Sequence, residues 1–124
     1  MGDLSEHFST WEFRCRHCGQ VLLNQDLVPT LERIRARYGR PMMVVSGYRC
    51  PEHNAKIGGG PEHLDGQAAD IAITNSQERF ELIKAAIEEG IKRIGPDEGF
   101  VHIGISKTLP QRVIWLYPRK AETP

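Results

Sequence analysis

The chain alternates between segments with apolar residues every three or four positions and short segments with apolar residues at every second position. Apolar spacing between Asp26 and Tyr38 predicts an amphipathic helix. Asp26 stands where an N-cap is expected, and Gly39 stands where the helix would end. The positions that set this spacing are Leu27, Leu31, Ile34 and Tyr38.

A second helix is predicted from Ser76 to Glu89. Asn75 or Ser76 can cap its start, and Gly90 follows its end. Helical spacing leads us to expect that its buried face is formed by Phe80, Ile83 and Ile87.

Two apolar segments between these helices predict strands. Met42–Val45 is continuously apolar after a proline, which is typical of a buried strand. Gln67–Thr74 follows an Asp65-Gly66 turn and alternates between polar and apolar positions. The intervening stretch Cys50–Gly60 contains a proline and three consecutive glycines, so we expect a loop there.

The last part of the chain predicts two further strands, Phe100–Ile105 and Arg112–Tyr117. The segment Ser106–Gln111 between them is long enough for a hairpin loop. Together these elements indicate an α+β fold in which two main helices pack on a small antiparallel sheet. No linker or internal repeat divides the chain, so we expect residues 1–124 to form a single domain.

Two of the predicted strands each carry one polar side chain on an otherwise apolar or small-residue pattern. Side chains alternate between the faces of a strand, so Asp70 lies opposite the core face of its strand, and His102 does the same in its own. Small residues flank both positions and leave room for a cleft floor. The core faces are formed by Ala69, Ile71 and Ile73 in one strand and by Val101, Ile103 and Ile105 in the other.

A third metal-competent side chain, His63, precedes Asp70 by seven positions. The Asp65-Gly66 turn would let the chain fold back and bring His63 to Asp70. Two imidazoles and one carboxylate are a recurring set of catalytic zinc ligands, with a position left for water. The spacing alone also allows a structural histidine at His102 and a turn-capping role for Asp65 or Asp70.

Composition excludes several classes of protein. Hydrophobic residues make up 40% and charged residues 26% of the chain, as in ordinary globular proteins. Lys+Arg and Asp+Glu both number 16, so the formal net charge is zero, which argues against nucleic acid as the main partner. The chain carries no apolar run of membrane-spanning length and no visible signal peptide, so we expect synthesis in the cytoplasm without membrane insertion.

The chain contains three cysteines, Cys15, Cys18 and Cys50. An odd number without a secretory signal argues against a disulfide framework. The Cys15-x-x-Cys18 spacing is that of a zinc knuckle, with Cys50 as a third ligand and His53, His17 or His7 as a fourth. A second close cysteine pair is missing, however, and we therefore expect free thiols. Zero net charge also argues against a nucleic-acid-binding knuckle.

An ordered set of motifs resembles the family of zinc D-Ala-D-Ala carboxypeptidases and peptidoglycan endopeptidases, the M15-like peptidases. These enzymes act on bacterial cell walls and in phage lysis, and they share a fold with the hedgehog signalling domain. The resemblance runs from Leu4 to Trp115. Its motifs are Ser46-Gly47-Tyr48-Arg49, His53-Asn54, Gly58-Gly59, His63-x-x-Gly66-x-Ala68-x-Asp70-Ile71 and Phe100-Val101-His102.

The resemblance implies a zinc-dependent peptidase that acts on peptidoglycan stem peptides as a monomer, on the cell wall after release. It implies His63, Asp70 and His102 as the zinc ligands. Arg49 would bind substrate and stabilise charge on the carbonyl oxygen, because a guanidinium beside a metal adds a second positive group. Ser46 and Tyr48 are the expected neighbours of Arg49 in substrate binding.

The chain departs from the family pattern at three positions. Relatives often place the general base three residues before the last histidine, where this chain has Gly99. Glu98 is the substitute we favour, followed by Asp97. Relatives also often carry a serine where Pro61 stands and an acidic residue where Gly104 stands. These departures leave open a second function, a zinc-binding module without catalytic activity.

Overall fold

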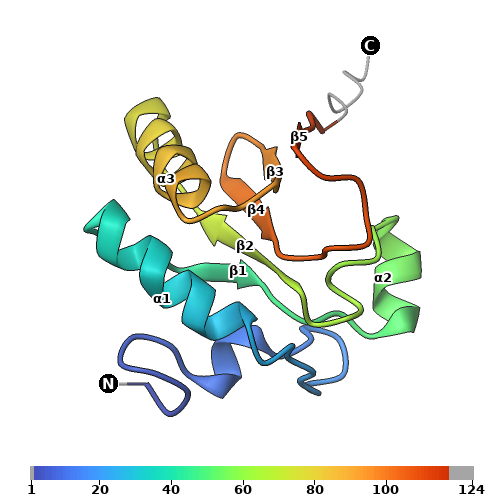
Figure 1. The fold of residues 1–124 in the computed structure, drawn as a ribbon. Coiled ribbons are helices and arrows are strands. Elements are labelled where there is room, and N and C mark those ends of the chain that lie inside the picture. The colour runs from blue at the N-terminus through green and yellow to red at the C-terminus, as the bar shows by residue number, and fades with distance from the viewer. Residues whose placement is uncertain (1, 118–124) are drawn as a thin grey trace.

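The computed structural model describes residues 2–117 of the chain. A five-stranded sheet with the order β1-β2-β4-β3-β5 forms its centre (Figure 1). The bounds are Val44–Ser46 for β1, Ala68–Ala72 for β2, Arg93–Pro96 for β3, Phe100–Gly104 for β4 and Val113–Ile114 for β5. All neighbouring strands are antiparallel except β3 and β5, which are parallel.

Two helices cover one face of the sheet. The helices α1 (Leu27–Tyr38) and α3 (Ser76–Glu88) lie side by side against one face, whereas α2 (Pro51–Ile57) lies apart from them (Figure 1). A short 3-10 helix, η1 (Thr10–Phe13), precedes α1 and lies against β1. The α+β prediction is therefore confirmed, with a third helix added to the two that the sequence predicted.

The main core lies between the sheet and the α1–α3 pair. Alternation on β2 and β4 sends one set of side chains into this core, as predicted, and turns Asp70 and His102 to the opposite face. The core residues from the sheet include Ala69, Ile71, Val101 and Ile103, and those from the helices include Leu31, Ile34, Leu82 and Ala86. A rigid apolar layer thus supports the two polar side chains from behind.

The predicted helices are close to the observed ones, but one buried face is wrong. Gly39 ends α1 in the left-handed conformation, and the Asn75 side chain caps α3 by accepting from the Glu78 amide. On α3, Ile83 packs partly buried against the core as predicted. Phe80 is 65% exposed and Ile87 is 53% exposed, however, whereas Leu82 is fully buried. Helical spacing identifies an apolar face, and packing against α1 selects a different one here.

The predicted loop Cys50–Gly60 is wrong, because residues 51–57 form α2. Pro51 occupies the first helical position. An N–H at this position would have no acceptor within the helix, so a proline costs no hydrogen bond there. The Cys50 sulfur accepts from the amide of His53, and Gly58 ends the helix in the left-handed conformation. Proline and glycine therefore mark the two ends of a short helix here, not an irregular segment.

The strand predictions need four corrections. The first strand is Val44–Ser46, and the segment alternates, with Met43 70% exposed beside buried Val44. The predicted hairpin after β4 is wrong, since β4 pairs with β2 and β3. The strand β3 was not predicted. It separates β4 from β5, which contains only Val113–Ile114 of the expected Arg112–Tyr117.

Candidate metal centre

His63, Asp70 and His102 meet at one point on the face of the sheet opposite the main core. Asp70 and His102 are direct register partners on β2 and β4, so their side chains emerge side by side. His63 lies in the turn before β2. Asp70 Oδ1 is 3.2 Å from His63 Nε2 and 3.1 Å from His102 Nδ1, and all three side chains are buried.

A backbone carbonyl orients His63. Its Nδ1 lies 2.6 Å from the Gly47 carbonyl oxygen, which can only accept, so Nδ1 carries the proton. The opposite nitrogen, Nε2, therefore points its lone pair toward Asp70. The Gly47 backbone can lie close to Phe13 because glycine has no side chain: a Cβ there would lie 2.6 Å from Phe13 Cα. The close packing of η1 against the end of β1 thus fixes the imidazole.

A buried carboxylate, that of Glu62, orients His102 in the same way. His102 Nε2 lies 2.8 Å from Glu62 Oε1 and donates to it, which leaves Nδ1 facing Asp70. Glu62 is in turn held by Arg93, whose Nε is 3.0 Å away, and by the amide of Ser106 at 3.2 Å. Sequence reasoning missed Glu62, although it directly precedes His63. The sequence carries no signal for this contact, because Glu62 and His102 are forty positions apart and meet only in the folded chain.

Lone pairs on three atoms point at the same place. In the described part of the chain, His63 Nε2 and Asp70 Oδ1 are buried and make no hydrogen bond. Two facing acceptors repel and lose hydration, so their burial is costly unless a cation lies between them. A tetrahedral zinc ion separates neighbouring nitrogen and oxygen ligands by about 3.4 Å, close to the observed spacings. The donor set and its geometry therefore fit zinc.

Charges at the centre reinforce one another. Burial raises the pKa of Asp70, but the neighbouring His102 and His63 outweigh it and hold that pKa far below its usual range. Burial likewise raises the pKa of Glu62, and His102 and Arg93 bring it below its ordinary value. Burial lowers the pKa of His102, whereas Asp70 and Glu62 raise it further than burial lowers it. A proton on His102 Nδ1 would therefore compete with a metal ion for this atom.

Arg49 reaches the centre from the loop between β1 and α2. Its Nη2 lies 3.1 Å from Asp70 Oδ2, the oxygen that does not face the histidines. Its Nε donates to Ser46 Oγ at 3.1 Å, and its Nη1 donates to Asn54 Oδ1 at 3.3 Å. Asn54 belongs to α2, the helix that the sequence did not predict. A Cβ at Gly59 would overlap both Asn54 and Arg49, so this glycine leaves space for the hydrogen bond between their side chains.

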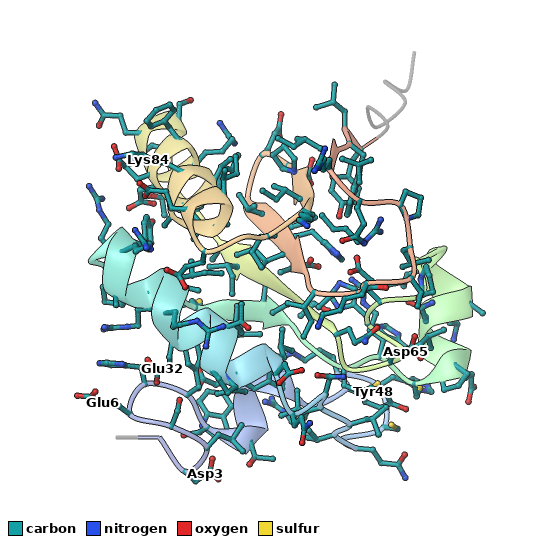
Figure 2. All side chains as sticks on the ribbon, viewed as in Figure 1. Asp3, Glu6, Glu32, Tyr48, Asp65 and Lys84 are labelled. Atoms are coloured by element: carbon teal, nitrogen blue, oxygen red, sulfur yellow. The ribbon has the colours of Figure 1, made fainter. Side chains whose placement is uncertain are left out.

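Tyr48 directly precedes Arg49 in this loop, and its amide donates to the Phe13 carbonyl at 2.9 Å. Burial and then the charges of Cys18, Cys50 and Cys15 raise the pKa of its phenol. Figure 2 places Tyr48 where the N-terminal segment meets the chain that leads into α2. The structure thus brings Ser46 to Arg49, whereas no hydrogen bond between the Tyr48 side chain and Arg49 is found among the described residues.

Asp97 and Glu98 lie in the turn between β3 and β4. Arg79 of α3 donates to both of their backbone carbonyls, Nε to Asp97 at 3.3 Å and Nη2 to Glu98 at 3.0 Å. The Glu98 side chain is exposed, whereas Asp97 is half-buried. Burial and then the charges of Asp70 and Asp97 raise the pKa of Tyr117, while a hydrogen bond with Trp115 lowers it. Asp97 is thus the less exposed of the two carboxylates in this turn.

Two aromatic side chains after β5 adjoin the centre. The Trp115 ring packs edge-on against His102 with centroids 4.9 Å apart, and Tyr117 packs against Phe100 at 5.2 Å. Arg93 lies over the Trp115 ring at 5.0 Å. A Cβ at Gly95 would lie 2.5 Å from Trp115 Cε2, so that glycine admits the indole. The parallel β3–β5 pair, which periodicity did not predict, places these rings.

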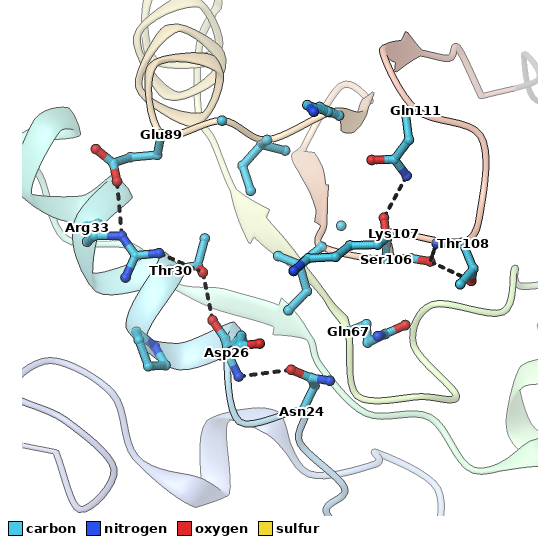
Figure 3. Close-up of a pocket in the computed structure, with 16 residues that line it drawn as sticks. Asn24, Asp26, Thr30, Arg33, Gln67, Glu89, Ser106, Lys107, Thr108 and Gln111 are labelled. Atoms are coloured by element: carbon cyan, nitrogen blue, oxygen red, sulfur yellow. Dashed lines mark hydrogen bonds and ion pairs between the residues drawn. The ribbon is translucent and has the colours of Figure 1, made fainter.

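A hollow of about 800 Å³ lies away from this centre, between α1, the end of α3 and the segment after β4 (Figure 3). Its lining includes Arg33, Glu89, Lys107 and Gln111, and it contains none of the three converging ligands. Arg33 pairs with Glu89 across its edge at 3.1 Å. Its polar groups largely satisfy one another, and they do not converge on a single point.

Comparison with known proteins is consistent with the site. The sequence profile of the family described as Peptidase M15 matches residues 4–104, which include all three converging ligands, Arg49 and both turn carboxylates. No curated protein gives a significant match to the chain. Among residues 2–117, no helix combines the length and apolar character needed to cross a membrane.

Proposed function

The chain belongs to the peptidase M15 family, and on that premise we propose that it is a zinc metallopeptidase that hydrolyses peptide bonds in peptidoglycan stem peptides. Members of this family are generally zinc-dependent and act on peptides. The convergence of His63 Nε2, Asp70 Oδ1 and His102 Nδ1 carries the proposal. Within the described part of the chain the first two of these buried atoms make no hydrogen bond, and a cation shared by all three would satisfy them. The 124 residues are proposed to act as one domain and as a monomer.

The zinc ion would be held by these three atoms, with Glu62 and the Gly47 carbonyl fixing the imidazoles. When bound, zinc supplies a Lewis acid that polarises the scissile carbonyl and makes water nucleophilic near neutral pH. The protein residues restrict where the substrate can lie. The Trp115 ring covers one side of His102, so we propose that the peptide approaches from the side of Arg49.

Arg49 is proposed to stabilise the negative charge that develops on the carbonyl oxygen. Its guanidinium is held by Asp70, Ser46 and Asn54, so little reorganisation is needed when that charge appears. The side chain is 12% exposed, which leaves one edge accessible to a substrate. Ser46 is proposed to act mainly by positioning this guanidinium, and Tyr48 to contact substrate farther from the metal.

The general base is proposed to be one of the two carboxylates in the β3–β4 turn. Asp97 is half-buried in this turn, which favours it over an exposed carboxylate. Glu98, favoured from sequence for its longer side chain, is exposed and is held through its backbone by Arg79. The chosen residue would take a proton from the attacking water and pass it to the leaving amine.

The test combines metal analysis with digestion of purified muropeptides. We expect chelator-sensitive cleavage that zinc restores, and loss of cleavage in His102→Ala. His7→Ala is the matched control, because His7 is a partly exposed histidine paired with Glu32 away from the centre. Mass analysis of the products separates release of terminal D-alanine from internal cleavage. Cleavage that persists in the chelator and in His102→Ala would contradict the proposal.

A second candidate function is a zinc-binding module without turnover. The observation that favours it is Gly99, which stands where the family resemblance leads one to expect the base and has no carboxylate. Asp97→Asn and Glu98→Gln, separately and together, decide between the two. Stoichiometric zinc with no cleavage of any muropeptide by the wild type would support the module. Cleavage abolished by one of these changes supports the enzyme.

A further inference from the structure

A second cluster of metal-competent side chains lies outside the site described above. Cys15 and Cys18 follow η1, whereas Cys50 precedes α2 more than thirty positions later. The fold brings their three sulfur atoms within 4.8 Å of one another, and none of them forms a disulfide. The sequence favoured free thiols because it shows no second close cysteine pair. The tertiary structure supplies the missing partner, Cys50, from the position that caps the start of α2.

The backbone around the cluster favours sulfur in its metal-binding form. The Cys50 amide donates to Cys15 Sγ at 3.3 Å, and the His53 amide donates to Cys50 Sγ at 3.4 Å. A thiol sulfur is a weak acceptor, so N–H groups directed at two sulfurs stabilise thiolates. Thiolates this close together repel one another unless a cation lies between them. A disulfide between two of them would leave the third sulfur without a partner.

An imidazole stands at the edge of the cluster. His17 Nδ1 lies 3.6 Å from Cys50 Sγ. Tetrahedral zinc, with its usual bond lengths to sulfur and nitrogen, separates two such ligands by about 3.6 Å. The His17 ring stacks on the His53 ring at 5.7 Å and 6°, which holds it beside the sulfurs. His7 is remote from this arrangement, since it pairs with Glu32.

We propose that Cys15, Cys18, Cys50 and His17 bind a second zinc ion with a structural role. Three thiolates and one imidazole form a closed four-ligand set with no position for substrate, as in other structural zinc sites. Cys15 and Cys50 are buried and Cys18 is exposed, so the ion would lie close to the surface. This proposal does not depend on the peptidase activity.

The second zinc would join two segments that adjoin the first metal centre. Cys50 directly follows Arg49, and the Tyr48 amide donates to the Phe13 carbonyl at 2.9 Å. Arg16, between the two paired cysteines, donates to the Val44 carbonyl at 3.2 Å. A metal link at this point would hold the loop that carries Arg49 against the N-terminal segment. The cysteines would thereby position Arg49 without touching substrate.

The test measures zinc per chain after purification under reducing conditions. We expect two zinc ions in the wild type and one in Cys18→Ser, a change at an exposed side chain that disturbs no core contact. His63→Ala should also retain one, and the double variant none. Cys50→Ser is a second probe, because serine can still accept from the His53 amide and keep α2 capped.

Cobalt gives a readout that is independent of activity. Cobalt bound by thiolates has an intense sulfur-to-metal charge-transfer absorption in the near ultraviolet. We expect this absorption in wild type and in His63→Ala, and its loss in Cys18→Ser. A wild type with no more than one zinc, unchanged in Cys18→Ser, would overturn the second site. So would a mass two hydrogens lighter than the reduced chain with a single bound zinc, which indicates a disulfide.

The fourth ligand is tested by a matched pair of histidine variants. We expect zinc competition with a chromophoric chelator to show weaker binding at the cysteine site in His17→Ala and unchanged binding in His7→Ala. If zinc binding were weaker in His53→Ala and unchanged in His17→Ala, the assignment of His17 as the fourth ligand would be overturned. Thiol titration of the folded protein supplies a check, because zinc should protect all three cysteines and a chelator should expose them.

Discussion

The Glu62 carboxylate occupies the space that a side chain at position 104 would fill, since a Cβ built on Gly104 would overlap both of its oxygens. From there Glu62 holds His102 Nε2 at 2.8 Å. The family resemblance leads one to expect an acidic residue at position 104. In this chain Glu62, which directly precedes His63, supplies an acidic group instead, and Gly104 leaves room for it.

Replacing Glu62 should weaken zinc binding without unfolding the protein. Glu62→Gln keeps the volume but can no longer offer a charged acceptor to His102 and Arg93. We expect zinc affinity to fall about 10- to 100-fold, the usual effect of removing a carboxylate behind a ligand histidine. Chelator competition measures this loss. Glu81→Gln, at an exposed glutamate of α3, is the control, and equal affinity in both variants would refute the role of Glu62.

Gly104→Ala should produce a related defect by displacing the Glu62 carboxylate. The added Cβ meets this side chain, so the cost depends on how far Glu62 can shift. We expect weaker zinc binding and a lower melting temperature in the metal-free protein, because Glu62 loses contact with the Ser106 amide. Calorimetry with and without zinc separates the two effects. Gly60→Ala, where nothing lies within 4 Å of an added Cβ, is the control.

The metal-free protein should be most stable between about pH 4.5 and 6.5. The pKa values of Asp70 and Glu62 are lowered in the folded protein, so their stabilisation is present above their ordinary values of 3.8 and 4.5 and is lost in acid. The pKa of His102 is raised, so its stabilisation is present below 6.5 and is lost as the pH rises through the folded value. Urea unfolding with a chelator, from pH 3 to 9, measures this window.

Zinc should stabilise the protein more as the pH rises, in contrast to the loss of stability expected for the metal-free protein. Zinc takes the place of the proton on His102 Nδ1, so its affinity should increase as that proton leaves. We expect the melting-temperature difference between zinc-loaded and metal-free protein to widen from pH 5.5 to pH 7.5. A difference that stays constant over this range would show that His102 does not exchange a proton for the metal.

Arg49 should affect turnover much more than zinc content. Arg49→Ala removes the charge proposed to face the carbonyl oxygen, and we expect kcat to fall about 10²- to 10³-fold, as for loss of one preorganised donor. Arg49→Lys should recover little, because an ammonium cannot contact Asp70, Ser46 and Asn54 together. Arg40→Ala, at an exposed ion pair with Glu78, is the control. Unchanged kcat in Arg49→Ala would remove the residue from the mechanism.

The observed buried face of α3 predicts very different losses of stability for Leu82 and Phe80. Leu82→Ala should lower the free energy of unfolding by about 2–5 kcal/mol, because Leu82 is fully buried in the core. Phe80→Ala should change it by less than about 0.5 kcal/mol, because that ring is 65% exposed. Urea titration of both variants decides the point. A larger loss at Phe80 would restore the face that helical spacing predicted.

Local patterns predicted the parts of this protein that local physics controls. Alternation on two strands placed Asp70 and His102 opposite the core, because successive side chains of any strand point to opposite faces. The caps at Asn75 and Gly39 were predictable for a similar reason, since each residue acts within one helical turn. The metal-competent side chains could therefore be named from the chain alone.

Long-range packing controlled the rest. The sequence could not show that β3 lies between β4 and β5, that Glu62 reaches His102, or that Cys50 meets the Cys15–Cys18 pair. Each of these contacts joins residues distant along the chain, and its free energy depends on how the whole core packs rather than on local periodicity. The sequence thus determined which groups can bind metal, whereas the folded chain determined which of their atoms face one another.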